Sequence, residues 1–100
     1  MAWRLRDIPK TVLVNGNIWE IRYCRSIENE PDAVGLCDSH DKEILIVTSI
    51  CQDEKARTLI HELIHAIEFE YDIQIPHNLV YKLEEPIYRL ICDNWRYILK

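Results

Sequence analysis

The sequence is short of the residues and runs that mark several classes of protein. It holds only two glycines and four prolines in 100 residues, with no Gly/Ser linker, internal repeat or low-complexity run. We therefore expect one domain over residues 1–100. No apolar run approaches the length of a membrane span, and none follows the N-terminal residues Trp3 to Asp7. We expect neither a membrane helix nor a signal peptide.

The sequence also lacks a basic surplus and any C-x-x-C pair. Its net charge is −5, which argues against nucleic acid as the main partner, because nucleic-acid binders usually carry an excess of Lys and Arg. Without a signal peptide, we expect reduced and mostly buried thiols in a cytoplasmic protein; the alternative is a disulfide pair or a cysteine metal ligand. The cysteines concerned are Cys24, Cys37, Cys51 and Cys92.

The pattern of the first half of the chain indicates β-strands. Thr11 to Val14 is β-branched and apolar, and Asn15-Gly16 predicts a type I′ hairpin turn, because both central residues of that turn need positive φ. Residues 18–23 alternate in polarity, as a strand with one buried face requires. A polar loop then precedes a second strand pair. The predicted strands are 11–14, 18–23, 33–38 and 43–48.

The pattern of the second half indicates two helices. Apolar residues recur at helical spacing up to about Tyr71, and Ser49 or Asp53 is expected to cap the start. A second apolar stripe follows Asn78, its expected cap, while Pro86 either kinks this helix or marks its true start. Strands followed by helices predict an α+β fold: a small antiparallel or mixed sheet of about four strands, covered on one face by two packed helices.

The segment His61-Glu62-Leu63-Ile64-His65 carries the strongest chemical pattern. Two histidines four positions apart on a helix present both rings on one face, which suits two ligands of a single zinc ion. Glu62 lies about 100° around the helix from His61, so it can act beside the metal as a general base. The flanks are apolar and uncharged, which predicts a buried helix. Glu68 and Tyr71 stand where the metzincin pattern has Gly and His, so that class is excluded.

The third zinc ligand depends on the second helix. A catalytic zinc normally takes three protein ligands and leaves one position for water. Glu84 shares the inward face of Val80 and Ile87, so we favour Glu84 as the third ligand, which is the gluzincin arrangement. Glu85, about 100° further around the helix, and His77 are the alternatives.

The stretch Thr58 to Ile67 resembles the extended zincin signature. The approach to it, Gly35–Asp38 followed by a polar turn and 43–47, is similar to small phage and prophage metallopeptidases related to the ImmA/IrrE-like group of minimal gluzincins. The ending, Ile87 to Asn94, also looks like the C-terminal helix of those proteins. This resemblance covers about residues 33–95, and it implies zinc, a cytoplasmic location and cleavage of a protein substrate. The SprT-like group is also similar, and there the third ligand is a downstream histidine. His77 could fill that place, but Asn78 follows it where that group tends to have Gly.

We therefore expect a zinc-dependent peptidase (a hydrolase), with a catalytically silent zinc-binding interaction module of phage origin as the alternative. Tyr81 or Tyr88 is a candidate donor to the oxyanion, on helix position alone. The expected partner is a protein or peptide substrate bound by β-augmentation along strand 43–48, with no nucleic acid and no membrane. The expected cofactor is Zn²⁺, and the expected site residues are the ligands His61, His65 and Glu84 with the catalytic base Glu62.

Overall fold

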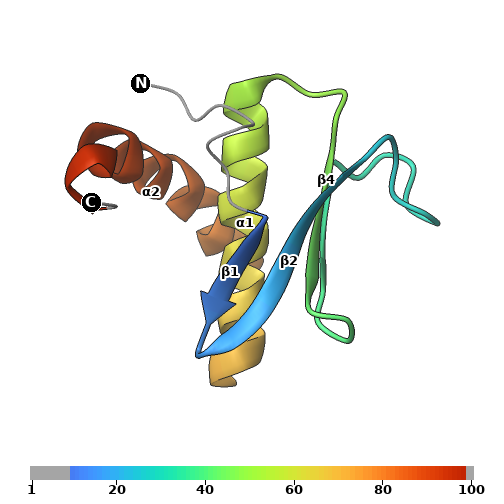
Figure 1. Ribbon diagram of the computed structural model, residues 1–100, viewed down its shortest axis with the longest axis horizontal. Helices are drawn as coiled ribbons and strands as arrows, with labels where there is room; N and C mark the ends of the chain where they lie inside the picture. The colour runs from blue at the N-terminus through green and yellow to red at the C-terminus, as the bar shows by residue number, and fades with distance from the viewer. Residues whose placement is uncertain (1–9, 99–100) are drawn as a thin grey trace.

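The computed structural model describes residues 10–98, except for the side chains of residues 95–98. A mixed four-stranded sheet is followed by two helices (Figure 1), which confirms the predicted α+β fold. The expected single domain extends at both ends beyond the described residues. None of the helices described here is long and apolar enough to cross a membrane. The elements are β1 (Thr11–Val14), β2 (Asn17–Cys24), β3 (Gly35–Asp38), β4 (Glu43–Val47), α1 (Gln52–Tyr71) and α2 (His77–Ile98).

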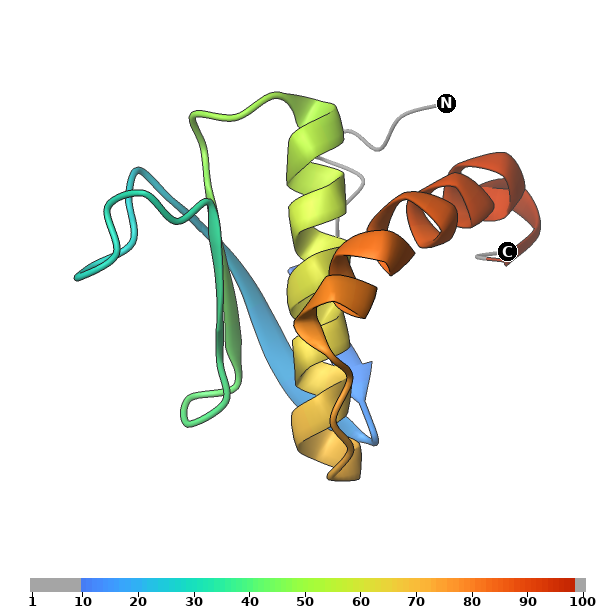
Figure 2. The same ribbon diagram turned by 180° about the vertical axis from the view of Figure 1, so that it is seen from behind.

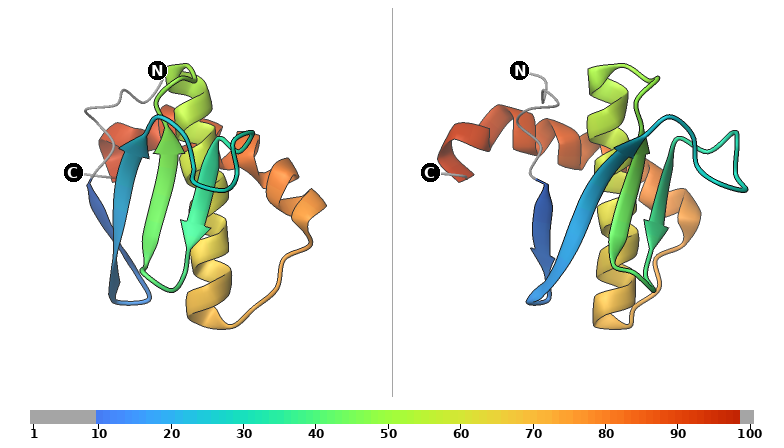
Figure 3. Two further views of the ribbon diagram at one scale, coloured as in Figure 1. Left: turned by 90° about the vertical axis from the view of Figure 1, so that its right-hand side faces the viewer. Right: turned by 45° about the vertical axis from the view of Figure 1, so that its right-hand side comes forward.

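Two hairpins lie side by side and make the sheet (Figure 3). β1 pairs with β2 through the predicted turn, in which Asn15 has φ 51° and Gly16 has φ 79°. β3 pairs with β4 in the same antiparallel way, and β2 runs parallel to β4 between the two hairpins. The strand order is therefore β1-β2-β4-β3, and β4 is an internal strand.

One face of the sheet forms the core with α1. Alternate side chains of β2 and β4 point toward the helix, and Trp19, Ile44 and Ile46 are fully buried there, next to Leu59 of α1. α2 packs on α1 rather than over the sheet, so α1 is the middle layer of the molecule (Figure 2). α1 therefore contacts the sheet on one side and α2 on another.

The helix starts differ in detail from those predicted. α1 begins after Cys51, whose side chain makes no capping hydrogen bond, so the predicted cap by Ser49 or Asp53 is wrong. Asp53 instead accepts a hydrogen bond from the Tyr88 hydroxyl at 2.9 Å, which ties α2 to the first turn of α1. α1 ends where Asp72 adopts the left-handed conformation with φ 52°.

α2 begins at His77, one residue before the predicted cap Asn78. The helix continues through Pro86, so this proline does not mark its start; the path of α2 curves along its length (Figure 2). Val80 and Tyr88 are the buried residues of its inner face. Because the helix starts at residue 77, its first side chain already stands beside α1.

The cysteines are free, as expected. Three of them are half-buried, but Cys51 is exposed at the start of α1, so the expectation of mostly buried thiols is too strong for that residue.

Candidate metal centre

α1 is buried on one side and carries two histidines on the other. Ile60 and Ile64 are 3% and 5% exposed in the core, whereas His61 and His65 are half-buried beside a cleft. The four-residue spacing puts the two rings one turn apart, with centroids 4.8 Å from each other. The predicted pair of ligands is thus brought together on one face.

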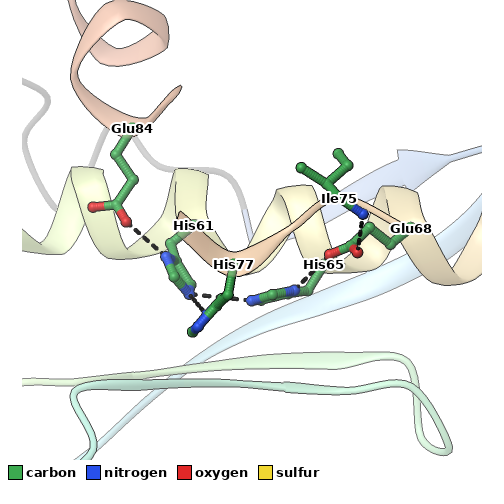
Figure 4. A network of polar contacts seen from close by, with 6 residues as sticks. All are labelled: His61, His65, Glu68, Ile75, His77 and Glu84. Atoms are coloured by element: carbon green, nitrogen blue, oxygen red, sulfur yellow. Dashed lines mark hydrogen bonds and ion pairs between the residues drawn. The ribbon is translucent and has the colours of Figure 1, made fainter. Parts of the chain in front are cut away.

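A third imidazole joins them from α2, as Figure 4 shows. The Nε2 atom of His61 lies 3.1 Å from Nε2 of His65 and 3.2 Å from Nε2 of His77. One ligand atom from each of the three residues falls within 4.8 Å of the others, and no fourth His, Cys, Asp or Glu of residues 10–94 belongs to this group.

The geometry of this cluster fits zinc. Ligand nitrogens at about 2.0–2.1 Å from a tetrahedral zinc lie about 3.3–3.4 Å apart, close to the His61–His65 and His61–His77 Nε2 separations. A carboxylate lies at Nδ1 of His61 and another at Nδ1 of His65. Because a carboxylate accepts a hydrogen bond, each ring carries its proton on Nδ1, and the Nε2 lone pairs face inward. Converging lone pairs repel one another unless a cation lies between them, so the donor set is suited to a metal ion.

Glu84, predicted from helix phase as the third ligand, is not in the group. Its Oε2 atom lies 2.6 Å from Nδ1 of His61, on the opposite side of that ring from the Nε2 cluster. Helix phase correctly predicted that Glu84 faces α1. Residue 84 lies two turns beyond the start of α2, however, and its carboxylate reaches only the Nδ1 side of the His61 ring. His77, at the start of α2, supplies the third nitrogen, while Glu85 pairs with Arg57 at 3.0 Å.

Glu68 has a role that the sequence did not suggest. Its Oε1 atom lies 2.7 Å from Nδ1 of His65, and its Oε2 atom accepts the backbone N–H of Ile75 at 2.8 Å (Figure 4). These hydrogen bonds, that of Ile75 first, lower the pKa of Glu68. The only sequence signal is the i,i+3 spacing of a carboxylate after a histidine.

Glu62 is buried beside the cluster, where β3 approaches α1. The residue is only 7% exposed, and burial raises the pKa of its carboxyl to about 7. Gly35 makes the approach of β3 possible: a Cβ there would lie 3.0 Å from Oε2 of Glu62 and would overlap the side chain of Thr58. No hydrogen bond to the Glu62 side chain comes from residues 10–94, so its oxygens are available to a molecule in the cleft.

The cluster lies in a cleft of about 1100 Å³ between β3, α1 and the start of α2. Tyr81 lines it, with its ring 4.9 Å from that of His61. Tyr88 does not, because its hydroxyl is bonded to Asp53 at the far end of α1. Cys37 also lines the cleft, but burial first and Glu62 second raise its pKa to about 12, so the thiol stays protonated and is a poor metal ligand at neutral pH.

The strand beside the cleft is β3 and not β4. Strand 43–48 was expected to offer a free edge, but β4 pairs on both sides, so that expectation is wrong. Directly before β3, the carbonyl of Val34 accepts the Val47 N–H at 3.0 Å. Alternation along an antiparallel ladder then turns the backbone N–H and C=O groups of Gly35 and Cys37 outward, to the edge with which no other strand of residues 10–98 pairs. This edge is called the free edge of β3.

Comparisons with protein-family models, with curated proteins and with solved structures gave no match for this chain.

Proposed function

We propose that this protein is a zinc-dependent peptidase whose metal is held by His61, His65 and His77. The observation that carries the proposal is the convergence of three imidazole Nε2 atoms in a cleft that also holds a buried carboxylate, Glu62. Three nitrogen ligands with one open position are typical of catalytic zinc sites, whereas structural zinc sites are closed by four protein ligands. His77 is thus the proposed third ligand, in place of Glu84, which helix phase favoured.

The chain supplies a base and an orienting frame for hydrolysis. When bound, zinc polarises a substrate carbonyl and makes water a stronger nucleophile near neutral pH. Glu62 accepts a proton from that water at its carboxylate oxygen and passes it to the departing amine nitrogen. The burial of Glu62 makes its carboxylate more basic than an exposed one. Tyr81, the tyrosine that lines the cleft, is proposed to donate a hydrogen bond to the developing oxyanion.

The substrate is proposed to lie along the free edge of β3. An extended peptide there can pair with the outward backbone groups of Gly35 and Cys37. Both residues line the cleft, so a strand paired with them would pass over Glu62 and the three histidines. This replaces the expected docking strand 43–48 with the edge that the fold leaves free.

The proposal is tested by comparing the wild-type protein with Glu62→Gln after loading with zinc. We expect both proteins to retain about one zinc per chain, and kcat/KM toward a quenched fluorescent peptide library to fall at least about 10²-fold in the variant, the lower range for removal of a general base. Glu28→Gln, in an exposed loop, is the matched control and should cleave at the wild-type rate.

Three outcomes contradict the proposal in different ways. Equal cleavage by Glu62→Gln and wild type would remove Glu62 as the base. Zinc bound by both proteins without cleavage by either would favour the catalytically silent zinc-binding module. Zinc retained by neither would contradict the metal centre itself.

A further inference from the structure

The cleft is lined by Asp and Glu side chains that face no Lys or Arg there. Among the described residues that line it, none is Lys or Arg. We infer that the cleft selects cationic peptides, with Lys or Arg on both sides of the bond to be cut; the inference rests on the proposed function in taking the ligand to be a peptide. The acidic residues of the lining are Glu30, Asp32, Glu62, Glu68, Asp72 and Glu84.

The negative charge persists when a metal ion is counted. A zinc ion brings two positive charges against the five carboxylates other than Glu62, so a net negative charge remains around the substrate. A concave site lined by one sign of charge focuses its field and raises the local concentration of oppositely charged ligands. Acidic peptides should therefore be disfavoured even in the zinc-loaded protein.

Three of these carboxylates have no cationic partner within residues 10–94, and they are called the uncommitted acids below. Glu68 and Glu84 are held by histidine Nδ1 atoms, and Glu62 is the buried base. Glu30, Asp32 and Asp72 are exposed, and within residues 10–94 no cation pairs with them. They are consequently free to pair with charges on a bound peptide.

The uncommitted acids lie at opposite ends of the cleft. β3 and α1 run in the same direction past the site (Figure 3). Gly35, at the start of β3, faces Thr58 and Glu62, whereas Asp72 lies at the C-terminal end of α1. The loop with Glu30 and Asp32 precedes β3, so it lies toward the start of α1. A peptide paired with β3 would thus pass an acidic group on each side of the metal centre.

Each end also offers an exposed apolar side chain within two residues of its acid. Val34 is 43% exposed two residues after Asp32, and Ile73 is 47% exposed directly after Asp72; both line the cleft. Lys and Arg combine an apolar stem with a charged head. An acid next to an exposed aliphatic group is complementary to that combination, and Glu or Asp side chains would meet repulsion in the same place.

The experiment uses zinc-loaded protein and fluorogenic peptides of equal length that differ only in flanking residues: Lys, Gln or Glu. We expect kcat/KM to follow the order Lys, Gln, Glu, with at least about a tenfold ratio between Lys and Glu at low salt. The ratio should fall toward one as salt rises to about 1 M, because exposed charges are then screened within about 3 Å.

A double variant identifies the residues responsible. Asp32→Asn with Asp72→Asn should reduce the Lys-to-Glu ratio to less than about threefold, and Asn tolerates the left-handed φ of 52° at position 72. Glu20→Gln removes one charge from an exposed position on the outer face of β2, and it should leave the ratio unchanged.

The outcomes separate this inference from the proposed function. Cleavage with no dependence on flanking charge overturns the inference and leaves the peptidase intact. If no peptide is cut, fluorescence anisotropy of labelled Lys-rich and Glu-rich peptides with the metal-free protein decides: preference for the Lys-rich peptide supports cationic selection while the peptidase proposal fails, and equal binding overturns the inference as well.

Discussion

At the scale of single residues, the two ring nitrogens of His61 have separate surroundings. Nε2 of His61 faces the other two histidines, whereas its Nδ1 meets Glu84 at 2.6 Å. A carboxylate at Nδ1 fixes the tautomer and orientation of a metal-binding histidine, and losing it typically costs about 10–100-fold in metal affinity. Replacing a residue that binds the metal should therefore reduce zinc affinity more than replacing a residue that only orients a ligand.

That difference gives the first prediction. His77→Ala should weaken zinc binding by more than about 100-fold, whereas Glu84→Gln should weaken it by about 10–100-fold. Competition with a chromophoric zinc chelator measures both affinities. Asn78→Ala, at the exposed neighbour of His77, is the control and should bind zinc like wild type. A larger loss for Glu84→Gln than for His77→Ala would restore the glutamate as third ligand.

The sequence predicted those parts of the site that are fixed by local geometry. His61, Glu62 and His65 are set by the repeat of one helix, and the structure brings them together. The choice between Glu84 and His77 depends on the path of the connector from Asp72 to Pro76, which helix phase does not describe. The connector begins at the left-handed residue Asp72, and α2 begins at His77. Together these two features determine which side chain of α2 lies near Nε2 of His61.

At the scale of elements, the connector between α1 and α2 is held by the same carboxylate that orients His65. Glu68 bonds Nδ1 of His65 with one oxygen and the N–H of Ile75 with the other. Ile75 lies two residues before His77, so a single side chain orients one proposed ligand and fixes the segment that delivers another. Glu68 is in this sense a positioning residue, because it acts on the metal through other groups.

We predict that Glu68→Gln lowers zinc affinity by about 10–100-fold. It should also lower the thermal unfolding temperature of the metal-free protein, because a lowered pKa means that the ionised carboxylate stabilises the fold at neutral pH. Glutamine can still accept from Ile75, but its neutral amide is a weaker acceptor for the histidine proton. Glu85→Gln, which removes a surface pair between α1 and α2, is the control. If both variants lowered the metal-free unfolding temperature equally and left zinc affinity unchanged, Glu68 would be only structural.

Strand positions followed from the sequence better than strand partners did. The Asn15-Gly16 turn and the alternation of β2 fix one hairpin locally. The predicted pair 33–38 and 43–48 forms the second hairpin, with the slightly shorter strands Gly35–Asp38 and Glu43–Val47. The parallel pairing of β2 with β4 joins residues more than 20 positions apart, and no local pattern encodes it. The docking edge was misassigned for this reason.

At the scale of the whole molecule, Glu70 joins both hairpins to the end of α1. Its side chain is 6% exposed and accepts hydrogen bonds from Asn17 at 2.7 Å, Trp19 at 2.8 Å and Lys42 at 2.7 Å. Asn17 and Trp19 belong to the first hairpin, and Lys42 belongs to the turn of the second. Lys42 first, then Trp19 and Asn17, lower the pKa of Glu70.

This pKa shift predicts how stability depends on pH. A carboxyl whose folded pKa is lowered stabilises the fold above its unfolded pKa of about 4.3, and this contribution disappears as pH falls through the folded pKa. Glu70→Gln should therefore have a lower free energy of unfolding than wild type at pH 7, and the difference should shrink below about pH 4. Urea unfolding across this range measures the effect, with Glu28→Gln as an exposed control. A difference that is independent of pH would exclude the ionised carboxylate as its source.

The free edge of β3 also affects how copies of this protein behave toward one another. An unpaired strand edge is a template for any extended chain, including an unfolded copy of the same protein, and it is therefore a source of aggregation. Two features of β3 limit this risk: it spans only Gly35–Asp38, and exposed acids flank it in the preceding loop. Identical copies would bring these like charges together at the shared edge, so self-association there should be opposed electrostatically while the same edge stays open to chains of opposite charge.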